Sequence, residues 1–163
     1  MYYRILGNQD LIGIRVLTDT VIKALDKKEW WRPVMSEERH YFDQTWTFLN
    51  GCFLNDGTMV AMSGLFMNPE ECAEHALEAD LDPVTTAELS RCMVLGPFRG
   101  RKITLRLNMD LIDYAKMRAK TDLVAAVHPD NAAMAQSLIQ LGMKPERNMD
   151  DGLQKYVIYR MKL

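Results

Sequence analysis

The chain has 163 residues, of which 48% are hydrophobic and 26% charged, with a formal net charge of -2, and we expect one ordinary globular domain spanning residues 1–163. The slight negative charge argues against broad nucleic-acid binding, and no window approaches the roughly 18 uninterrupted apolar residues of a membrane span. Because the N-terminus lacks the zones of a signal peptide and the three cysteines form no CxxC pair, we predict reduced thiols and a cytoplasmic protein.

The first half of the chain reads as a strand, two helices and a hairpin. The predicted elements are, in order, a strand over 2–6, a helix over 11–26 capped by Asp10, a second helix from Ser36, and strands over 47–54 and 58–66. Asn55-Asp56-Gly57 between the last two strands is a hairpin signal, because such a sequence tolerates positive φ.

Strands and helices alternate in the second half. The expected elements are an acidic helix opened by Pro69, a strand over 85–94, an amphipathic helix over 102–118, an apolar strand over 123–127, a helix marked by Met134, Ala135, Leu138 and Leu141, and a strand over 155–163. Gly142 fits the left-handed position that ends a helix. This order predicts a mixed α/β sheet.

A cationic turn follows the strand that ends in Cys92-Met93-Val94. Residues 97–103 read Pro-Phe-Arg-Gly-Arg-Lys-Ile and place Arg99, Arg101 and Lys102 beside a helix start. A pyrophosphate needs backbone N–H groups at such a start, and flanking cations strengthen the hold. The alternative is a solvated basic helix start without a ligand, and the turn is not a Walker A loop, which needs Gly-Lys-Ser/Thr.

A second motif, Val127-His128-Pro129-Asp130-Asn131, lies where the apolar strand meets the last helix. Taken alone, it also fits a simple junction in which Asp130 or Asn131 caps the helix. Together the two motifs, in this order and separated by one helix and one strand, resemble the acyl-CoA-binding half of the GNAT superfamily, the N-acetyltransferases that use acetyl-CoA. The resemblance covers about residues 45–163 and is loose over 1–44, where the superfamily usually builds its acceptor pocket.

The resemblance implies a single-domain α/β fold and an acetyl-CoA co-substrate. The sheet would be mixed and mostly antiparallel, flanked by about four helices, with a V-shaped splay between the strands ending near Val94 and Val127. No metal is implied. The residues that would contact CoA are Met93, Val94, Leu95, Arg99, Gly100, Arg101, Lys102, Ile103, Thr104, Asn131, Ser137 and Leu138.

Two positions of the cationic turn depart from the family pattern. That pattern is Arg or Gln, two residues, Gly, one residue, then Gly or Ala, and here Lys102 and Thr104 occupy the two small-residue positions. We expect the Lys102 ammonium and the Thr104 hydroxyl to reach the phosphates instead. The backbone N–H of Val94 is the expected donor to the developing oxyanion.

Glu88 is the candidate general base. In histone-acetyltransferase-like members a glutamate six residues before the valine position has this role, and Glu88 stands six residues before Val94. Side chains alternate along a strand, so Glu88, Ser90, Cys92 and Val94 are expected to share one face. The alternative is a structural glutamate, since many members use other groups or waters.

Leu138 occupies the position where many members carry the tyrosine that protonates the departing thiolate. A leucine side chain cannot act as a general acid. A thiol has a pKa of about 8.5, so unassisted departure near neutral pH is feasible, and Ser137 or a held water are possible substitutes.

Two further groups of residues have open interpretations. The acidic residues Glu70, Glu71, Glu74, Glu78, Asp80 and Asp82 either attract a cationic amine or form a solvated helix face. Trp30, Trp31 and Arg32, with His40, Tyr41 and Trp46, either line an acceptor pocket or cover the core. We interpret His128, at a strand end, as structural rather than catalytic.

The sequence thus predicts an N-acetyltransferase that moves an acetyl group from acetyl-CoA to a primary amine of a small molecule by direct attack on the thioester. No covalent enzyme intermediate is implied. A protein or peptide acceptor is one alternative, and a non-catalytic acyl-CoA-binding sensor, in which the departures at Lys102 and Leu138 reflect lost chemistry, is another. Assembly as a homodimer stays open.

Overall fold

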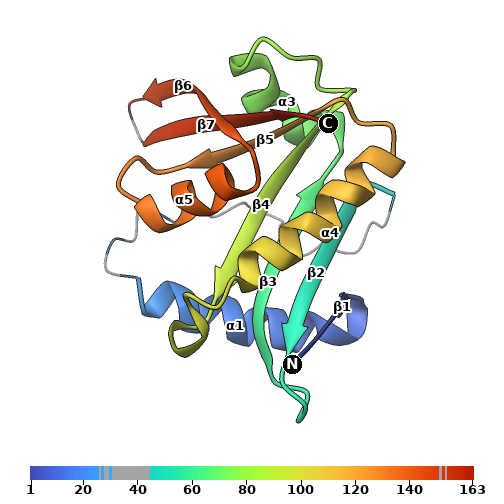
Figure 1. Ribbon diagram of the computed structural model, residues 1–163, viewed down its shortest axis with the longest axis vertical. Helices are drawn as coiled ribbons and strands as arrows, with labels where there is room; N and C mark the ends of the chain where they lie inside the picture. The colour runs from blue at the N-terminus through green and yellow to red at the C-terminus, as the bar shows by residue number, and fades with distance from the viewer. Residues whose placement is uncertain (26, 28–29, 31–44, 151, 153) are drawn as a thin grey trace.

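In the part of the chain that the structure describes, a seven-stranded sheet with the order β1-β2-β3-β4-β5-β7-β6 forms the centre (Figure 1). The computed structural model describes residues 1–25, 27, 30, 45–150, 152 and 154–163. The strands are β1 (Tyr2–Ile5), β2 (Thr47–Phe53), β3 (Met59–Phe66), β4 (Thr86–Val94), β5 (Asp122–Val127), β6 (Lys144–Asp150) and β7 (Lys155–Lys162). Only β4 and β5 pair in parallel among these strands, so the expected mixed, mostly antiparallel sheet is confirmed.

Helices cover both faces of the sheet. In the described residues they are α1 (Leu11–Lys23), α3 (Pro69–Glu78), α4 (Ile103–Met117) and α5 (Ala132–Gln140). Leu123 and Ala125 of β5 share the main core with Leu111 of α4 and Leu138 of α5, whereas Val124 packs beside Ala79 after α3. Because side chains alternate along a strand, α4 and α5 lie on one face and α3 on the other. Figure 1 shows α1 behind the sheet.

Most of the predicted elements are confirmed, including the hairpin at Gly57, where φ is 88°, and the left-handed end at Gly142, where φ is 94°. Asp10 is the N-cap residue of α1, as predicted, but its side chain makes no cap hydrogen bond. It instead accepts two hydrogen bonds of 2.7 Å from the Arg4 guanidinium. These bonds hold the pKa of Asp10 below its usual value. The second helix, expected from Ser36, lies outside the described residues.

The parallel pairing of β4 with β5 is short. It comprises the pairs Thr86↔Asp122, Ala87↔Leu123 and Glu88↔Val124, although β4 continues to Val94 and β5 to Val127. Beyond Glu88 the two strands diverge (Figure 1). The expected V-shaped splay is therefore confirmed, with a closed end at the start of both strands and an open end at Val94 and Val127.

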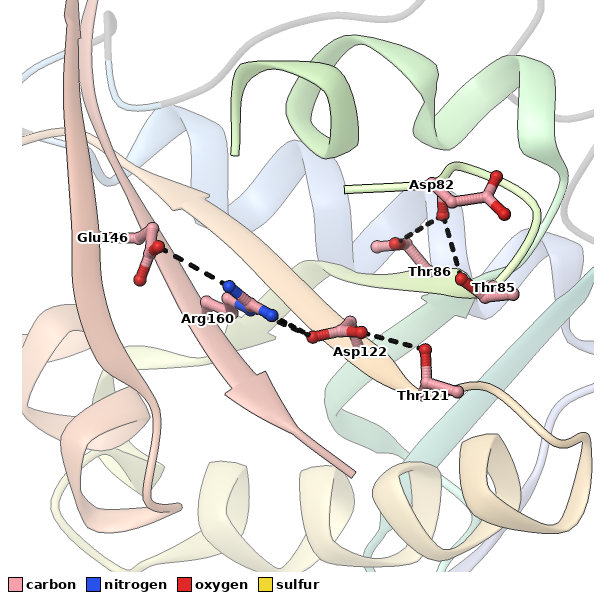
Figure 2. Close-up of polar contacts among 7 residues, drawn as sticks. All are labelled: Asp82, Thr85, Thr86, Thr121, Asp122, Glu146 and Arg160. Atoms are coloured by element: carbon pink, nitrogen blue, oxygen red, sulfur yellow. Dashed lines mark hydrogen bonds and ion pairs between the residues drawn. The ribbon is translucent and has the colours of Figure 1, made fainter. Parts of the chain in front are cut away.

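Polar contacts hold the closed end together (Figure 2). Asp122 accepts hydrogen bonds from Arg160 at 2.8 and 2.9 Å through one carboxylate oxygen and from Thr121 at 2.9 Å through the other. Arg160 also lies 3.6 Å from Glu146. The Asp82 carbonyl accepts from the hydroxyl of Thr86 at 2.8 Å just before β4 begins. The chain is thus fixed on both sides of the parallel pairing.

Candidate functional site

The open edge of β4 forms one wall of the candidate site. The Leu95 N–H donates to the Val60 carbonyl at 3.0 Å, and Val94 pairs with Ala61. In an antiparallel ladder this pattern makes Val94–Ala61 a non-hydrogen-bonded pair, so the Val94 N–H and C=O point away from β3. Since β5 no longer pairs with β4 there, the Val94 N–H faces the open part of the V.

The start of α4 lies directly beside this edge. Lys102 is the N-cap residue, and the helix has no side-chain cap. The first N–H groups of a helix, here from Ile103 onward, have no partner within the helix and carry its positive dipole end. Gly100 has a φ of 74° and Lys102 a φ of 59°, so the turn is strained at a non-glycine residue. This combination suits an anion.

The cations of the turn are exposed and take different directions. Arg99 Nε donates to the Val94 carbonyl at 3.3 Å, which places this guanidinium at the open edge of β4. The Arg101 guanidinium lies 5.3 Å from the centroid of the Phe98 ring. No side-chain partner of Lys102 is found in the described part of the chain. Three positive charges therefore surround the uncapped helix start.

Thr104 faces inward rather than toward the turn. Its hydroxyl and that of Ser63 hydrogen-bond the Cys92 thiol, but burial is the larger effect and raises the pKa of that thiol. Ile103, at 2% exposure, anchors the first turn of α4 in the core. The backbone of these two residues, not their side chains, is available to an anion.

The junction of β5 and α5 forms the opposite wall. Asn131 caps α5 by accepting from the Met134 N–H at 3.2 Å, which confirms its capping role. His128 Nδ1 accepts from the Asp130 N–H at 3.2 Å, in keeping with a structural part for this histidine. The Asp130 carboxylate forms an ion pair with Lys27, which holds its pKa below the usual value.

Within α5, the two residues expected at the CoA site differ in exposure. The half-buried Ser137 donates its hydroxyl to the Ala133 carbonyl at 3.0 Å. Leu138 is fully buried in the main core with Leu111, Val127 and Met143. Its side chain contributes packing at this position and no surface for a ligand.

Glu88 and Val94 do not share a face, so that prediction is wrong. Ser63 of β3 lies opposite two residues of β4, Arg91 and Cys92, and Arg91 has a φ of 56°. Such a β-bulge shifts the alternation of side chains by one residue. As a result Val94 packs on the α4 side with Ile103, whereas Glu88 faces α3.

On the α3 face, Glu88 is bonded to a residue that the sequence did not single out as functional. His75 Nδ1 of α3 lies 2.9 Å from Glu88 Oε2, and the side chains are 12% and 13% exposed. Nothing in the spacing between α3 and β4 indicates that these two side chains meet.

Most of the acidic segment has structural partners. Glu78 accepts from the Tyr156 hydroxyl at 2.8 Å, and Asp80 pairs with Arg147 at 2.5 Å. Asp82 also accepts from the Val84 N–H at 2.9 Å. Neither a uniformly solvated face nor a free acidic patch describes these contacts. Of the aromatic group, Trp31, Arg32, His40 and Tyr41 lie outside the described residues.

The splayed sheet and the uncapped, cation-flanked start of α4 are the features expected of an acyl-CoA-binding α/β fold. The sequence matches the model of the acetyltransferase (GNAT) family over residues 21–143. The chain belongs to this family, whose members are acyltransferases that use acetyl-CoA, and the resemblance seen in the sequence is confirmed.

Solved structures with the same fold span nearly the whole chain. YncA of Salmonella typhimurium, assigned as an acetyltransferase and solved with its cofactor acetyl-CoA, has a TM-score of 0.76 at 17% identity and is matched over 100% of this chain and 94% of its own. The ribosomal-protein-alanine N-acetyltransferase of Brucella melitensis has a TM-score of 0.72 at 20% identity over 100% of both chains. The ribosomal-protein-S5-alanine acetyltransferase of Vibrio fischeri has a TM-score of 0.74 at 14% identity, over 98% of this chain and 91% of its own.

No curated protein matches the sequence. Within the described ranges, no three or more His, Cys, Asp or Glu side chains are grouped so as to hold a metal ion. None of the helices in that part of the chain combines the length and apolar character needed to cross a membrane.

Proposed function

We propose that this protein transfers the acetyl group of acetyl-CoA to the primary amine of a small molecule. One observation carries the proposal: the uncapped start of α4, with Lys102 held in a left-handed conformation, lies beside the open edge of β4. Backbone N–H groups at the helix start fit a pyrophosphate, and Arg99, Arg101 and Lys102 add charge-assisted contacts.

From the turn, the pantetheine arm would run along the open edge of β4 toward the closed end of the V. Of the three residues expected there, Val94 would offer its backbone N–H to the arm, whereas Met93 and Leu95 direct their backbone groups toward β3 and the Leu95 N–H is already bonded to Val60. Asn131 and Ser137 would border the arm from the opposite wall. The Val94 N–H is the proposed donor to the negative charge that develops on the thioester oxygen. A donor of this kind is worth about 3 kcal/mol.

The proposed reaction is a direct acyl transfer. The amine nitrogen forms a bond with the thioester carbon, the carbon–sulfur bond breaks, and its electron pair leaves with the CoA sulfur. The proton released by the amine passes to Glu88, and the thiolate takes a proton from solvent. Glu88 and Val94 are separated along the strand by about 20 Å or less, given ~3.3 Å per residue and the bulge. The proton must therefore travel through ordered water.

A protein N-terminus is the second candidate acceptor. The solved structures from Brucella melitensis and Vibrio fischeri are named as acetyltransferases of ribosomal-protein alanine. At 20% and 14% identity they share the fold, and the acceptor does not follow from it. We favour a small amine because the sequence contains no additional segment that we can assign to peptide binding.

A thiol-release assay with acetyl-CoA tests the proposal. The acceptor panel should contain small primary amines, including polyamines and aminoglycosides, together with short peptides that begin with alanine, and mass spectrometry should identify the acetylated product. We expect thiol release with a small amine. Thiol release with the peptides alone would indicate that the acceptor is a protein N-terminus. CoA binding by calorimetry without release for any acceptor would instead indicate a sensor.

A further inference from the structure

The ion pair between His75 and Glu88 joins α3 to β4 at the point where the V opens. Glu88 and Val124 form the last residue pair of the parallel ladder. The carboxylate is reached from α3 by His75 Nδ1, which lies 2.9 Å from Oε2, and both side chains are nearly enclosed. This contact therefore lies between the fixed and the splayed parts of the sheet.

The two oxygens of Glu88 have different environments. Oε2 is engaged by His75, whereas no group in the described part of the chain donates to Oε1. Oε1 is not a buried atom that lacks a partner, so it reaches solvent. By contrast, each oxygen of Asp10 and of Asp122 accepts a hydrogen bond. Both oxygens of those two structural carboxylates have hydrogen-bond partners, whereas in Glu88 only Oε2 has one.

We propose that His75 is the positioning residue of the reaction: it holds Glu88 Oε2 from α3 and leaves Oε1 free to receive the proton of the acceptor amine. This inference rests on the proposed acetyl transfer. A free glutamate side chain samples many rotamers, and ordering it for proton transfer costs conformational entropy. Because His75 already holds Glu88 in one rotamer, the reaction does not bear this cost. His75 acts through Glu88 and does not itself touch the substrate.

Charged groups around His75 favour the orientation in which its Nδ1–H donates to Glu88. Burial works against the imidazolium, but the hydrogen bond to Glu88 and the charges of Glu88, Glu74 and Glu78 outweigh it and raise the pKa of His75. The Tyr156 ring of β7 meets the imidazole edge-on at 5.5 Å between centroids. His75 Nε2 is buried without a hydrogen-bond partner in the described part of the chain, so Glu88 is the contact that fixes the ring.

Two substitutions of His75 separate positioning from mere packing. His75→Leu removes the donor, whereas the amide N–H₂ of His75→Gln can still donate to Glu88. With acetyl-CoA and an amine that the wild type acetylates, we expect His75→Leu to lower kcat about tenfold or more, with acetyl-CoA affinity within a few-fold. His75→Gln should regain most of kcat.

Tyr156→Phe is the matched control. It removes the hydrogen bond to Glu78 on the same helix but keeps the aromatic ring beside His75. This variant should lose some stability and retain kcat. Wild-type kcat in His75→Leu would overturn the inference. If His75→Leu does not fold, His75→Gln decides: at least a third of wild-type kcat supports positioning, and a tenfold loss contradicts it.

An imidazole NMR titration gives a readout that does not depend on turnover. In the wild type the Nδ1–H tautomer of His75 should be observed, and Glu88→Gln should lower the pKa of His75, because the carboxylate that raises it is gone. An unchanged titration in Glu88→Gln would overturn the pairing. Failure of the proposed function looks different: the wild type would release no thiol with any acceptor, whatever the titration shows.

Discussion

The two ends of the V formed by β4 and β5 are built on different principles. At the closed end the strands pair, Asp122 has a hydrogen bond on each carboxylate oxygen, and Arg160 connects it to Glu146. At the open end the edge of β4 is unpaired by β5, α4 lacks a side-chain cap, and Lys102 adopts a left-handed conformation. Hydrogen-bonded backbone and side-chain groups stabilise the closed end. At the open end, backbone groups without such partners are available to bind a ligand.

This difference predicts that variants of the open end change binding or turnover, whereas variants of the closed end change stability. The largest effect should come from replacing Arg99, Arg101 and Lys102 together by Glu. The three reversed charges repel a pyrophosphate, so calorimetry should show CoA affinity lowered by more than about 100-fold, because hydrogen bonds to charged groups are worth ~1.5–3 kcal/mol each. Unchanged affinity would show that the turn does not take part in binding CoA.

Glu88→Gln should lower turnover by about 100-fold, because it keeps the shape of the side chain and removes its basicity. Steady-state kinetics across pH 6 to 9 should show the loss in kcat, with acetyl-CoA affinity within a few-fold. If the loss appears only in CoA binding, Glu88 is structural. If turnover stays near wild type, water or another residue accepts the proton.

Asp122→Asn tests the closed end. Removing one partner of a largely buried ion pair should lower the free energy of unfolding by about 3 kcal/mol, measured by urea denaturation. CoA affinity at a temperature where the variant is folded should be unchanged. A matched change at an exposed pair, Asp150→Asn beside Lys155, should cost less than about 1 kcal/mol. Strong loss of CoA affinity in Asp122→Asn would show that the two ends are not separable.

Leu138→Tyr tests a buried position behind the open end. Because Leu138 is fully buried, the larger ring should lower the free energy of unfolding by about 1–3 kcal/mol. Its hydroxyl should not reach the thiolate, so turnover should not rise. A hundredfold gain in turnover would mean that the wild-type site lacks an acid and that this position does face the ligand.

The smallest predicted effect concerns pH. A raised pKa means that folded His75 binds its proton more tightly than the unfolded chain does. This stabilisation is fully present below the unfolded value of about 6.5 and is lost as pH rises through the folded pKa. Glu88→Gln should therefore lower the free energy of unfolding more at pH 6 than at pH 9, measured by urea denaturation at both values. Equal destabilisation at both values would show that His75 does not titrate with Glu88.

The sequence predicted the elements well where local signals are strong. Pro69 opens α3, Gly57 turns the hairpin, and apolar spacing marks α4. It did not predict β6, which among the described strands pairs with β7 alone and is exposed along nearly all of its length. An edge strand without an apolar face has no alternation to detect.

The candidate site was predictable in part. The cationic turn and the capping Asn131 follow from their order along the chain. The bulge at Arg91 did not, because nothing in the local sequence marks an extra residue there, and it moved Glu88 to the α3 face. The contact of His75 with Glu88 depends on how α3 packs against β4, a long-range arrangement that periodicity does not encode.

An amide NMR titration with CoA shows where on the protein the ligand binds. We expect CoA to bind at the open end, over the start of α4 and along the edge of β4. We predict large shifts for the amide signals of Val94, Ile103 and Thr104, and small ones for Thr86 and Asp122 at the closed end. If CoA binds and the Val94, Ile103 and Thr104 signals stay in place, the ligand does not bind at the open end.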